Sequence, residues 1–388
     1  MNIKLLYLIP SLVNSGGMER VLTEKVNFLV STGDFEITIL TTDMSEEENS
    51  FFYLSDKIEL IKLPLYYKNY FNLNFFNKMV KIHSLNSIYK KNIIELFLKK
   101  EFDICITMGG KELEFITDLN LRSKVIYESH FNKNFRSSFL KANNKKNLFW
   151  NIFGRLRDWQ HTMQAKKVDK IVVLTDDNLK SWSSVTNNVI KIVNPSPLKN
   201  VNSQRPMLCS KRVIAIGKLD NQKGFDMLID AWSIVNNNYS DWRLDIFGTG
   251  SLEEKLQNQI YNLNLSNVVS LAGVTNNVMD ELLASSFLVL SSRFEGLPMV
   301  LIESITCGLP IVSFDCETGP REIISSNDCG LLIPNGDIKE LAKGIVRLIE
   351  NPQTLSNMSD QAIIKSSNYE LNKIMEKWIS LFNQITLK

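Results

Sequence analysis

The chain has few of the residues that build metal or disulfide sites. Its 388 residues include three widely separated histidines and five cysteines without a Cys-x-x-Cys pair. Separated histidines argue against a zinc site. An odd number of scattered cysteines indicates free, buried thiols in a reducing cytoplasm. No Asp-x-Asp motif occurs either. We expect no metal and no cofactor.

Long apolar runs are also missing. No stretch approaches the roughly 18 uninterrupted apolar residues of a membrane span. The N-terminus, Met1 to Pro10, lacks the charged region, apolar stretch and cleavage site of a signal peptide. With 44% hydrophobic and 22% charged residues and a net charge of +2, the composition is that of a soluble globular protein. We expect a cytoplasmic location.

Positive charge is concentrated in one region. Residues 62–170 hold 21 Lys/Arg and nine Asp/Glu, a net of +12, and aromatic residues are interleaved with the lysines. This mixture suits an anionic lipid surface, at about 1 kcal/mol per basic residue. It would also suit nucleic acid, or a solvated basic face whose aromatics belong to the core. We favour a peripheral position on the inner face of the cell membrane and expect no nucleic acid.

The chain is too long for one ordinary core, so two domains are expected. Short β-rich runs alternate with helical patterns, which is typical of parallel sheets covered on both faces. We therefore predict an α/β protein with two doubly wound, Rossmann-like domains that face a cleft. The proline-containing stretch from Val193 to Pro206 is the predicted linker. It separates a domain at 1–195 from a domain at 206–369.

The individual elements follow from apolar periodicity and turn residues. Strands are predicted at Lys4–Ile9, Glu36–Thr41, Ile58–Lys62, Ile104–Met108, Lys124–Ser129, Lys170–Leu174, Arg212–Gly217, Arg243–Phe247, Val268–Ala272, Phe287–Ser291, Ile311–Phe314 and Gly330–Ile333. Helices are predicted at 19–30, within the basic region, at 224–237, 251–263, 277–284, 298–307, 320–325 and 337–349, and through 355–387.

The most informative stretch runs from Glu295 to Glu303. It reads as the end of a strand, a Gly-Pro turn and a helix, with Glu295 in the loop and Glu303 inside the helix. Backbone N–H groups at the helix N-terminus favour a phosphate. Two acceptors flanking an anion site suit a molecule with hydroxyls at both ends, such as a nucleotide sugar. The alternative is a surface helix whose acids favour its N-terminal half.

Two further turns carry residues that suit an anionic ligand. Gly16-Gly17 stands at a strand–helix junction, where paired glycines let the backbone approach a ligand closely. Lys218 and Lys223 bracket a five-residue step before a helix, so both ammoniums can converge on one diphosphate. The alternatives are a purely structural turn for the glycines and two exposed lysines on a loop.

Two other features take different interpretations. His130 directly follows a predicted strand, where we expect it to face substrate rather than pack in the core. Gly248-Thr249-Gly250 lacks the third glycine of a dinucleotide fingerprint, so we interpret it as a tight turn and disfavour a dehydrogenase.

Taken together, a set of motifs along the whole chain resembles a known family. They are Gly16-Gly17-Met18-Glu19-Arg20, Gly217-Lys218-Leu219 with Lys223-Gly224, Gly248-Thr249-Gly250, Ser292-Arg293-Phe294-Glu295-Gly296-Leu297-Pro298 with Glu303, Gly308-Leu309-Pro310 and Gly319-Pro320-Arg321-Glu322. The chain resembles the retaining nucleotide-sugar glycosyltransferases of family 4, the group 1 glycosyltransferases, which have the GT-B fold. The resemblance implies an N-terminal acceptor domain, a C-terminal donor domain, and a C-terminal helix at about 370–388 that crosses back to the first domain.

The resemblance also implies roles for individual residues. Lys218 and Lys223 would bind the donor diphosphate, and Glu303 the ribose hydroxyls. Glu295 and the backbone of Gly296, Leu297, Pro298 and Met299 would hold the transferred sugar. Gly17 would let the first domain approach the donor phosphates, and His130 would contact the sugar. The family usually has arginine where Lys218 stands, and lysine keeps the charge but loses the bidentate fork.

The resulting hypothesis is a metal-independent glycosyltransferase in which His130, Glu295 and Lys223 act at the reacting sugar. It would move a hexose or N-acetylhexosamine, with UDP as the expected carrier, to a lipid-linked or polysaccharide acceptor in bacterial surface glycan biosynthesis. Two alternatives remain open: a nucleotide-sugar epimerase on the same scaffold, and a non-catalytic partner in glycan assembly. Donor conversion without an acceptor would reveal the first; intact Lys223, Glu295 and Glu303 argue against the second.

Overall fold

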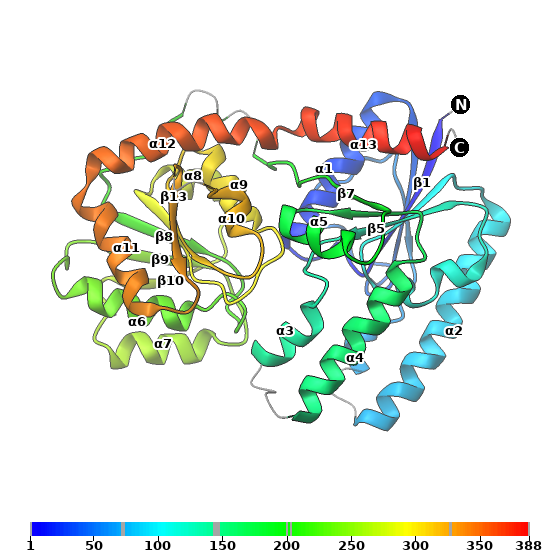
Figure 1. The fold of residues 1–388 in the computed structure, drawn as a ribbon, viewed down its shortest axis with the longest axis horizontal. Helices are drawn as coiled ribbons and strands as arrows, with labels where there is room; N and C mark the ends of the chain where they lie inside the picture. Colours follow the sequence, from blue (N-terminus) through cyan, green and yellow to red (C-terminus); the bar gives the residue numbers. More distant parts are fainter. Residues whose placement is uncertain are drawn as a thin grey trace. The chain divides into compact units, whose positions relative to one another are not determined.

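The computed structural model describes residues 2–70, 74–142, 148–198, 201, 204–325 and 328–386. The chain divides into two compact units. The first unit comprises Met1–Lys133, Arg155–Val193 and Asn372–Lys388, and the second comprises Asn134–Gly154 and Asn194–Leu371. Each unit contains a parallel sheet with helices packed on it (Figure 1).

The sheet of the first unit has seven strands in the order β3-β2-β1-β4-β5-β6-β7, and every neighbouring pair is parallel. The central strands are continuous apolar runs that are buried on both faces, which is why they appear as uninterrupted hydrophobic stretches. The strands are β1 Ile3–Ile9, β2 Phe35–Thr41, β3 Glu59–Lys62, β4 Ile104–Thr107, β5 Lys124–Ser129, β6 Lys170–Val173 and β7 Val189–Lys191.

The helices of the first half begin with α1, which follows the central strand β1. Gly33 ends α1 with a left-handed φ of 83°, a conformation that glycine adopts without strain. The helices are α1 Gly17–Thr32, α2 Phe75–Lys99, α3 Phe135–Ala142, α4 Leu148–Ala165 and α5 Asp176–Ser183, with 3₁₀ turns at Tyr67–Tyr70, Lys111–Glu114 and Ile116–Leu119.

The second unit repeats the design with six parallel strands in the order β10-β9-β8-β11-β12-β13. The strands are β8 Arg212–Ile216, β9 Arg243–Phe247, β10 Val269–Gly273, β11 Phe287–Leu290, β12 Ile311–Asp315 and β13 Gly330–Pro334. The helices are α6 Phe225–Asn236, α7 Glu253–Asn262, α8 Val278–Leu283, α9 Met299–Thr306, α10 Pro320–Ile323, α11 Ile338–Glu350 and α12 Pro352–Ser366.

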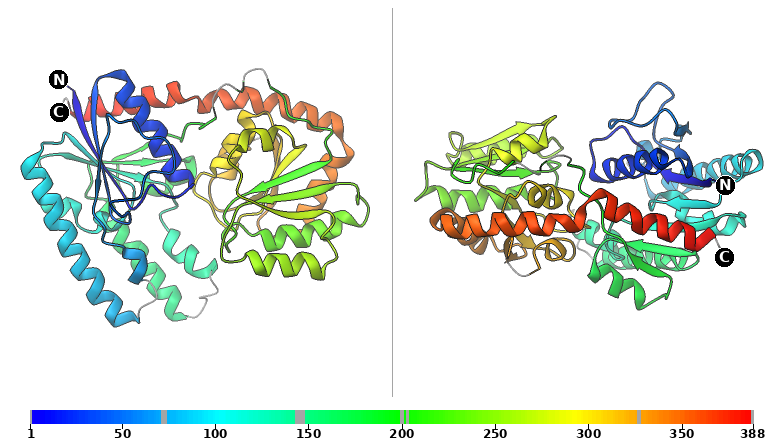
Figure 2. Two further views of the ribbon diagram at one scale, coloured as in Figure 1. Left: turned by 180° about the vertical axis from the view of Figure 1, so that it is seen from behind. Right: turned by 90° about the horizontal axis from the view of Figure 1, so that it is seen from above.

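The last helix, α13, returns to the first unit. It spans Leu371–Thr386 and follows a 3₁₀ turn at Ser367–Tyr369. Its buried face carries Trp378 and Phe382, and the Phe382 ring meets Phe35 at 5.9 Å between centroids. In the views of Figures 1 and 2, α13 lies beside α1. The predicted fold class, two Rossmann-like α/β units with a returning C-terminal helix, is confirmed.

Four departures from the predicted elements and domain bounds stand out. No helix was predicted at α5, Asp176–Ser183, which lies beyond the basic region. β7 was not predicted, because three half-buried residues at a sheet edge give no clear alternation. The helical segment predicted through 355–387 is two helices separated by the 3₁₀ turn at Ser367–Tyr369. The segment Asn134–Gly154, placed within the predicted first domain at 1–195, groups with the second unit.

In both sheets the chain reverses its order of strands at one point, between β1 and β4 in the first unit and between β8 and β11 in the second. In sheets of this type, the loops that leave two such neighbouring strands run apart, and ligands bind at the carboxyl ends of those strands. The loops after β8 and β11 carry Lys218, Lys223 and Glu295.

Glycine at 248 is required by the close packing of two loops in the second unit. Its φ is 141°, and a Cβ at this position would lie 1.9 Å from the carbonyl oxygen of Gly217. Gly250 is similarly tight, because its Cβ would lie 2.4 Å from the carbonyl oxygen of Leu219. The predicted structural role of the Gly248-Thr249-Gly250 turn agrees with this geometry.

We predict that Gly248→Ala destabilises the second unit far more than Gly336→Ala. Gly336 also has a positive φ, 81°, but a Cβ added there would meet no atom within 4 Å, so alanine there costs about 1 kcal/mol of backbone strain. Gly248→Ala adds a backbone collision and should lower the free energy of unfolding by at least about 2 kcal/mol more. Calorimetric melting of the full chain measures both; equal shifts would contradict the packing argument.

Candidate functional site

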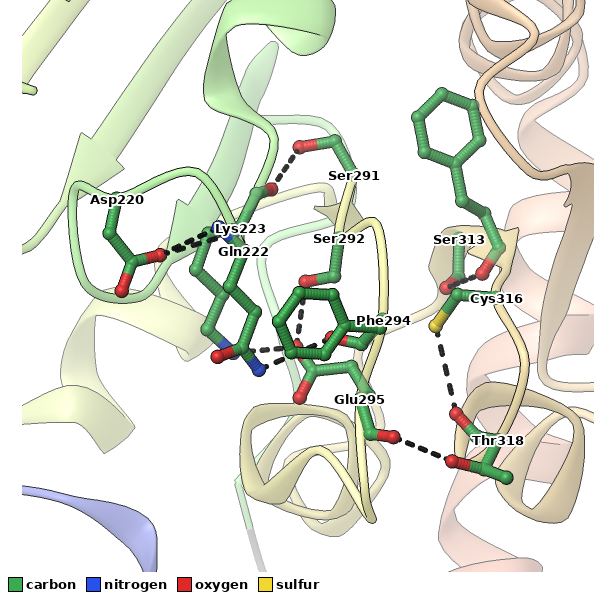
Figure 3. A network of polar contacts seen from close by, with 11 residues as sticks. Asp220, Gln222, Lys223, Ser291, Ser292, Phe294, Glu295, Ser313, Cys316 and Thr318 are labelled. Carbon is green, nitrogen blue, oxygen red and sulfur yellow. Dashed lines mark hydrogen bonds and ion pairs between the residues drawn. The ribbon is translucent and has the colours of Figure 1, made fainter. Parts of the chain in front are cut away.

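The ammonium of Lys223 connects the loop after β8 to the loop after β11. Its Nζ donates to Oε1 of Glu295 at 2.7 Å, and the hydroxyl of Ser292 donates to the same oxygen at 2.7 Å (Figure 3). Glu295 is buried, at 7% exposure, whereas the Lys223 side chain retains 19%. The second carboxylate oxygen, Oε2, receives no hydrogen bond from the described residues, so it is available to accept one from a ligand.

Backbone and side-chain bonds hold these two loops in fixed register. The hydroxyl of Ser291 donates to the carbonyl of Lys223 at 2.9 Å, and the side-chain amide of Gln222 donates to the carbonyl of Phe294 at 3.2 Å (Figure 3). Gly224 lets the loops approach, since a Cβ on it would lie 2.2 Å from the carbonyl oxygen of Ser291. The position of Lys223 is therefore set by the strand that carries Glu295.

An ion pair secures the outer side of the same loops. Arg293 binds both carboxylate oxygens of Asp226, at 2.9 and 2.6 Å, and also donates to the carbonyl of Asn221 at 2.9 Å. Burial alone would raise the pKa of Asp226, but the Arg293 guanidinium overcomes this and lowers it. Arg293 thus acts as a structural clamp in the loop and does not point to a separate chemical function.

The turn that follows Glu295 presents unused backbone donors. The amides of Gly296, Leu297, Met299 and Val300 have no backbone acceptor among the described residues, and α9 begins at Met299 without a side-chain cap. Free amides at a helix N-terminus favour an anion.

A third loop supports this turn from behind. The hydroxyl of Thr318 donates to the carbonyl of Glu295 at 2.5 Å (Figure 3). Gly319 packs so closely that a Cβ on it would lie 2.6 Å from the carbonyl oxygen of Gly296 and 2.6 Å from Cδ of Pro298. The loop after β12 therefore fixes the backbone of the residues predicted to hold the transferred sugar.

The remaining predicted residues of the second unit take distinct positions. Glu303 lies inside α9, one turn beyond its start, and is 6% exposed. Lys218 is exposed, and its ammonium has no ion pair with any described residue. The structure therefore brings Lys223, Glu295 and the start of α9 together, with Glu303 on the same helix and Lys218 on the loop that also carries Lys223.

In the first unit, Gly17 and His130 lie at the carboxyl edge of the sheet. Gly17 is exposed and begins α1 directly after the β1 loop. His130 follows β5, two strands from β1, and is 8% exposed. Its Nε2 lies 3.3 Å from Oε1 of Glu128.

Glu128 also forms a fully buried ion pair. Nζ of Lys25, on α1, donates to Oε2 of Glu128 at 2.6 Å, and the two side chains are 1% and 0% exposed. The ring of Trp378, on α13, lies 3.7 Å from the ammonium, a cation–π contact. Burial would raise the pKa of Glu128, but the Lys25 ammonium and His130 lower it to about 2. Burial lowers the pKa of Lys25, against the opposing effect of Glu128.

Sequence reasoning missed four residues of these two clusters. Ser292 stands in a quoted motif and Thr318 directly precedes another, but neither was given a role, and their partners follow only from the folded loops. Lys25 and Glu128 are 103 positions apart, and a lysine or glutamate is rarely buried completely. One feature of the sequence could have indicated this pair: Glu128 is a charged residue in the buried part of β5.

One prediction about the cysteines is wrong in part. Cys105, Cys307, Cys316 and Cys329 are buried free thiols, as expected, but Cys209 is exposed. It lies in a turn before β8, where a neighbouring apolar residue does not require burial.

Comparison with known proteins places the chain among glycosyltransferases. Residues 203–365 match the family described as "Glycosyl transferases group 1". An uncharacterized glycosyltransferase of Haemophilus influenzae is 30% identical over 97% of this chain and 98% of its own. The amylovoran biosynthesis glycosyltransferase AmsD of Erwinia amylovora is 28% identical over 98% of this chain and 99% of its own.

A further relative is named for its substrate. It is the Campylobacter jejuni enzyme called GalNAc-alpha-(1->4)-GalNAc-alpha-(1->3)-diNAcBac-PP-undecaprenol alpha-1,4-N-acetyl-D-galactosaminyltransferase, which is 23% identical over 98% of this chain and 99% of its own.

Two solved structures share the fold. TarM of S. aureus, crystallised with UDP, has a TM-score of 0.76 at 18% identity, covering 98% of this chain and 100% of TarM. The sucrose-phosphate synthase of Thermosynechococcus elongatus has a TM-score of 0.78 at 14% identity, covering 99% of each chain. These likenesses establish the GT-B fold.

We predict that Glu128 makes the first unit acid-sensitive. Because its pKa is lowered on folding, the unfolded chain takes up a proton at a higher pH than the folded chain does. The stabilisation is present above the ordinary glutamate pKa and is lost as the pH falls from about 5 towards 2. In Glu128→Gln this acid-dependent loss should disappear, although the stability at neutral pH will be lower because the buried Lys25 ammonium no longer faces a negative charge.

The measurement is the free energy of opening of β5 from native-state hydrogen exchange at several pH values. Glu95→Gln, a change at an exposed carboxylate on α2, serves as the control and should leave the pH profile of wild type. An unchanged acid slope in Glu128→Gln would contradict the assignment.

Proposed function

This chain belongs to the group 1 glycosyltransferases, and from that premise we propose which groups it transfers and how. The donor is a UDP-linked hexose or N-acetylhexosamine, and the acceptor is a lipid-linked or polysaccharide glycan of the bacterial surface. The observation that carries the proposal is the shared contact of Lys223 and Ser292 with Glu295 beside the free amides that begin α9.

The donor diphosphate would lie between the lysines and the start of α9. Lys223 keeps enough exposure to leave Glu295 and bind a phosphate oxygen, and Lys218 supplies a second ammonium from the same loop. The free amides at Met299 and Val300 add donors that point along the helix axis. These groups stabilise the negative charge that develops on the departing diphosphate.

The sugar and the nucleoside would contact the two glutamates. Oε2 of Glu295 receives no hydrogen bond from the described residues and would bind a sugar hydroxyl. Glu303, one turn into α9, would accept hydrogen bonds from the ribose. His130 of the first unit would contact the transferred sugar. The reaction proposed is transfer with retention, in which the acceptor hydroxyl attacks on the face that the diphosphate leaves and passes its proton to the leaving phosphate.

The relatives support this choice of substrates. TarM was crystallised with UDP, AmsD is named for amylovoran biosynthesis, and the Campylobacter jejuni relative is named for an undecaprenol-linked acceptor. We carry the nucleotide and the acceptor class over to this chain as part of the proposal. Absence of an acceptor-dependent product, with conversion of the donor sugar instead, would favour an epimerase.

A lipid-linked acceptor calls for a membrane-facing surface, and α4 offers one. Its exposed apolar residues recur every three or four positions and so form a stripe along one side of the helix. They are Leu148, Ile152, Leu156, Trp159 and Met163, with exposures between 44% and 75%. Arg155, Lys166 and Lys167 are exposed on or beside the same helix. An apolar stripe with basic neighbours suits the surface of an anionic bilayer.

Other aromatics of the basic region do belong to the core. Tyr67 and Tyr89 are buried with β1 and β4, whereas Phe76 on α2 is 80% exposed. None of the described helices is long and apolar enough to cross a membrane. We propose that the chain associates peripherally with the cytoplasmic face, chiefly through the α4 stripe.

Substitutions at the Lys223–Glu295 contact should separate nucleotide binding from transfer. Lys223→Met removes a charge-assisted phosphate contact and should weaken UDP binding about ten- to a hundredfold. Glu295→Ala should leave UDP binding equal or tighter, because Lys223 no longer has a competing partner, yet lower transfer by about a hundredfold or more. Calorimetric titration with UDP and a transfer assay measure the two effects.

The control for charge is Lys255→Met on α7, outside the site. It should change neither quantity. If Glu295→Ala weakens UDP binding as much as Lys223→Met does, Glu295 is a nucleotide ligand and its proposed role toward the sugar is wrong.

Membrane association should depend on the α4 stripe. The double variant Leu156→Ser and Trp159→Ser should bind vesicles that contain anionic lipid at least about tenfold less well, because two large apolar side chains no longer enter the interface. Ile234→Ser with Tyr261→Ser, at exposed apolar positions of the second unit, is the matched control. Failure of the wild-type chain to sediment with such vesicles at low salt would refute the surface.

A further inference from the structure

The burial of the Lys25–Glu128 ion pair is not explained by a gain in stability. Both charges are removed from water, and a buried ion pair is often no more stable than apolar side chains of the same size. The ammonium lies 3.7 Å from the centroid of the Trp378 ring and 5.8 Å from that of Tyr7 on β1, so β1, β5 and α13 of the first unit all meet the charge that α1 carries. The carboxylate of Glu128 also faces a second group, the imidazole of His130.

The imidazole of His130 lies beside the other oxygen of the Glu128 carboxylate: Lys25 contacts Oε2, and His130 faces Oε1. Oε1 of Glu128 and Nε2 of His130 are both sealed from solvent, and neither receives or donates a well-aligned hydrogen bond among the described residues. Each is the other's neighbouring polar atom, at 3.3 Å. Lys25 keeps Glu128 ionised, as the lowered pKa of Glu128 indicates, and an ionised carboxylate only accepts hydrogen bonds. Nε2 must therefore carry the proton.

The other ring nitrogen of His130, Nδ1, then has no proton and can only accept a hydrogen bond. In a neutral imidazole with a proton on Nε2, Nδ1 is an acceptor. Nδ1 receives no hydrogen bond from the described residues. Because Nε2 is sealed, the 7% of the side chain that stays exposed belongs to its other atoms, at the carboxyl edge of the sheet where a ligand is expected.

We propose that Glu128, held by Lys25, is a positioning residue that fixes His130 as the Nε2–H tautomer, so that Nδ1 is the acceptor offered to a hydroxyl of the transferred sugar. The part of this proposal that concerns the sugar rests on the proposed function. The tautomer itself follows from the first unit alone. Trp378 on α13 supports the same ion pair, because its ring covers the Lys25 ammonium.

The isosteric variant Glu128→Gln gives a sharp test. The Lys25 ammonium can only donate, so it takes the amide oxygen of glutamine and turns the amide NH₂ toward His130. Nε2 must then accept, and the proton moves to Nδ1. Since the chain has three histidines, ¹⁵N-histidine spectra resolve each ring, and His130→Gln assigns its signals. Spectra are recorded about two pH units above the ordinary imidazole pKa of about 6.5.

The expected result is Nε2–H in the wild type and Nδ1–H in Glu128→Gln. Glu128→Asp, which still carries an accepting carboxylate, should retain Nε2–H. Glu112→Gln, at another buried glutamate of the first unit, should leave the His130 spectrum unchanged. A wild-type spectrum with Nδ1–H, or the same tautomer in wild type and Glu128→Gln, would overturn the proposal, and the wild-type spectrum decides this even if the variant does not fold.

Turnover tests the consequence for the sugar. UDP release from UDP-N-acetylglucosamine and UDP-glucose should fall roughly ten- to a hundredfold in Glu128→Gln, with recovery in Glu128→Asp and with the affinity for UDP changed less than about twofold. A tautomer change with full turnover would also overturn the positioning role. Absence of turnover in the wild type would contradict the proposed function instead, and the spectra would then decide the role of Glu128 alone.

Discussion

The contact of Lys223 with Glu295 is the interaction on which the candidate site depends. It joins the first crossover loop of the second unit to the loop after β11, at the point where the strand order reverses. Several other contacts hold these loops together. They are the close approach at Gly224, the hydrogen bonds of Ser291 and Gln222, and the Arg293–Asp226 ion pair. Lys223 remains partly exposed, as the proposed exchange of the Glu295 carboxylate for a donor phosphate requires.

The first unit uses a related pair for a different purpose. There too a lysine after the first strand meets a glutamate farther along the sheet, at 2.6 Å, but Lys25 and Glu128 are completely buried. A buried ammonium has no solvent path to a new partner, so this pair holds a fixed charge, whereas the pair in the second unit can open. The difference in burial separates a structural ion pair that positions a neighbour from a contact that is available to a ligand.

The sequence predicts the fold well because the sheets are parallel and their central strands, such as β4 and β11, are apolar and buried. Predicted strands such as Lys124–Ser129 and Arg243–Phe247 agree with β5 and β9 at both ends. β7 escaped prediction because an edge strand of three half-buried residues carries little pattern. The break at Ser367–Tyr369 was missed because no glycine or proline marks it.

The candidate site was accessible to sequence reasoning only where its residues are close along the chain. Glu295, Glu303 and the turn between them fall within nine positions, and their strand–turn–helix context is visible in the sequence. The partners of Glu295 could not be predicted in this way. Lys223 is 72 positions away along the chain, and Ser292 contacts Glu295 only because the chain turns between them. Lys25 and Glu128 meet across 103 positions, which depends on the order of strands and not on any local pattern.

A crystal structure of the full chain with UDP tests the central claim most directly. The account predicts that the diphosphate lies at the start of α9 and that Nζ of Lys223 leaves Oε1 of Glu295 for a phosphate oxygen at about 2.8 Å. Glu295 should then face the open position where the sugar would be attached. UDP bound elsewhere, with Lys223 still 2.7 Å from Glu295, would contradict the account.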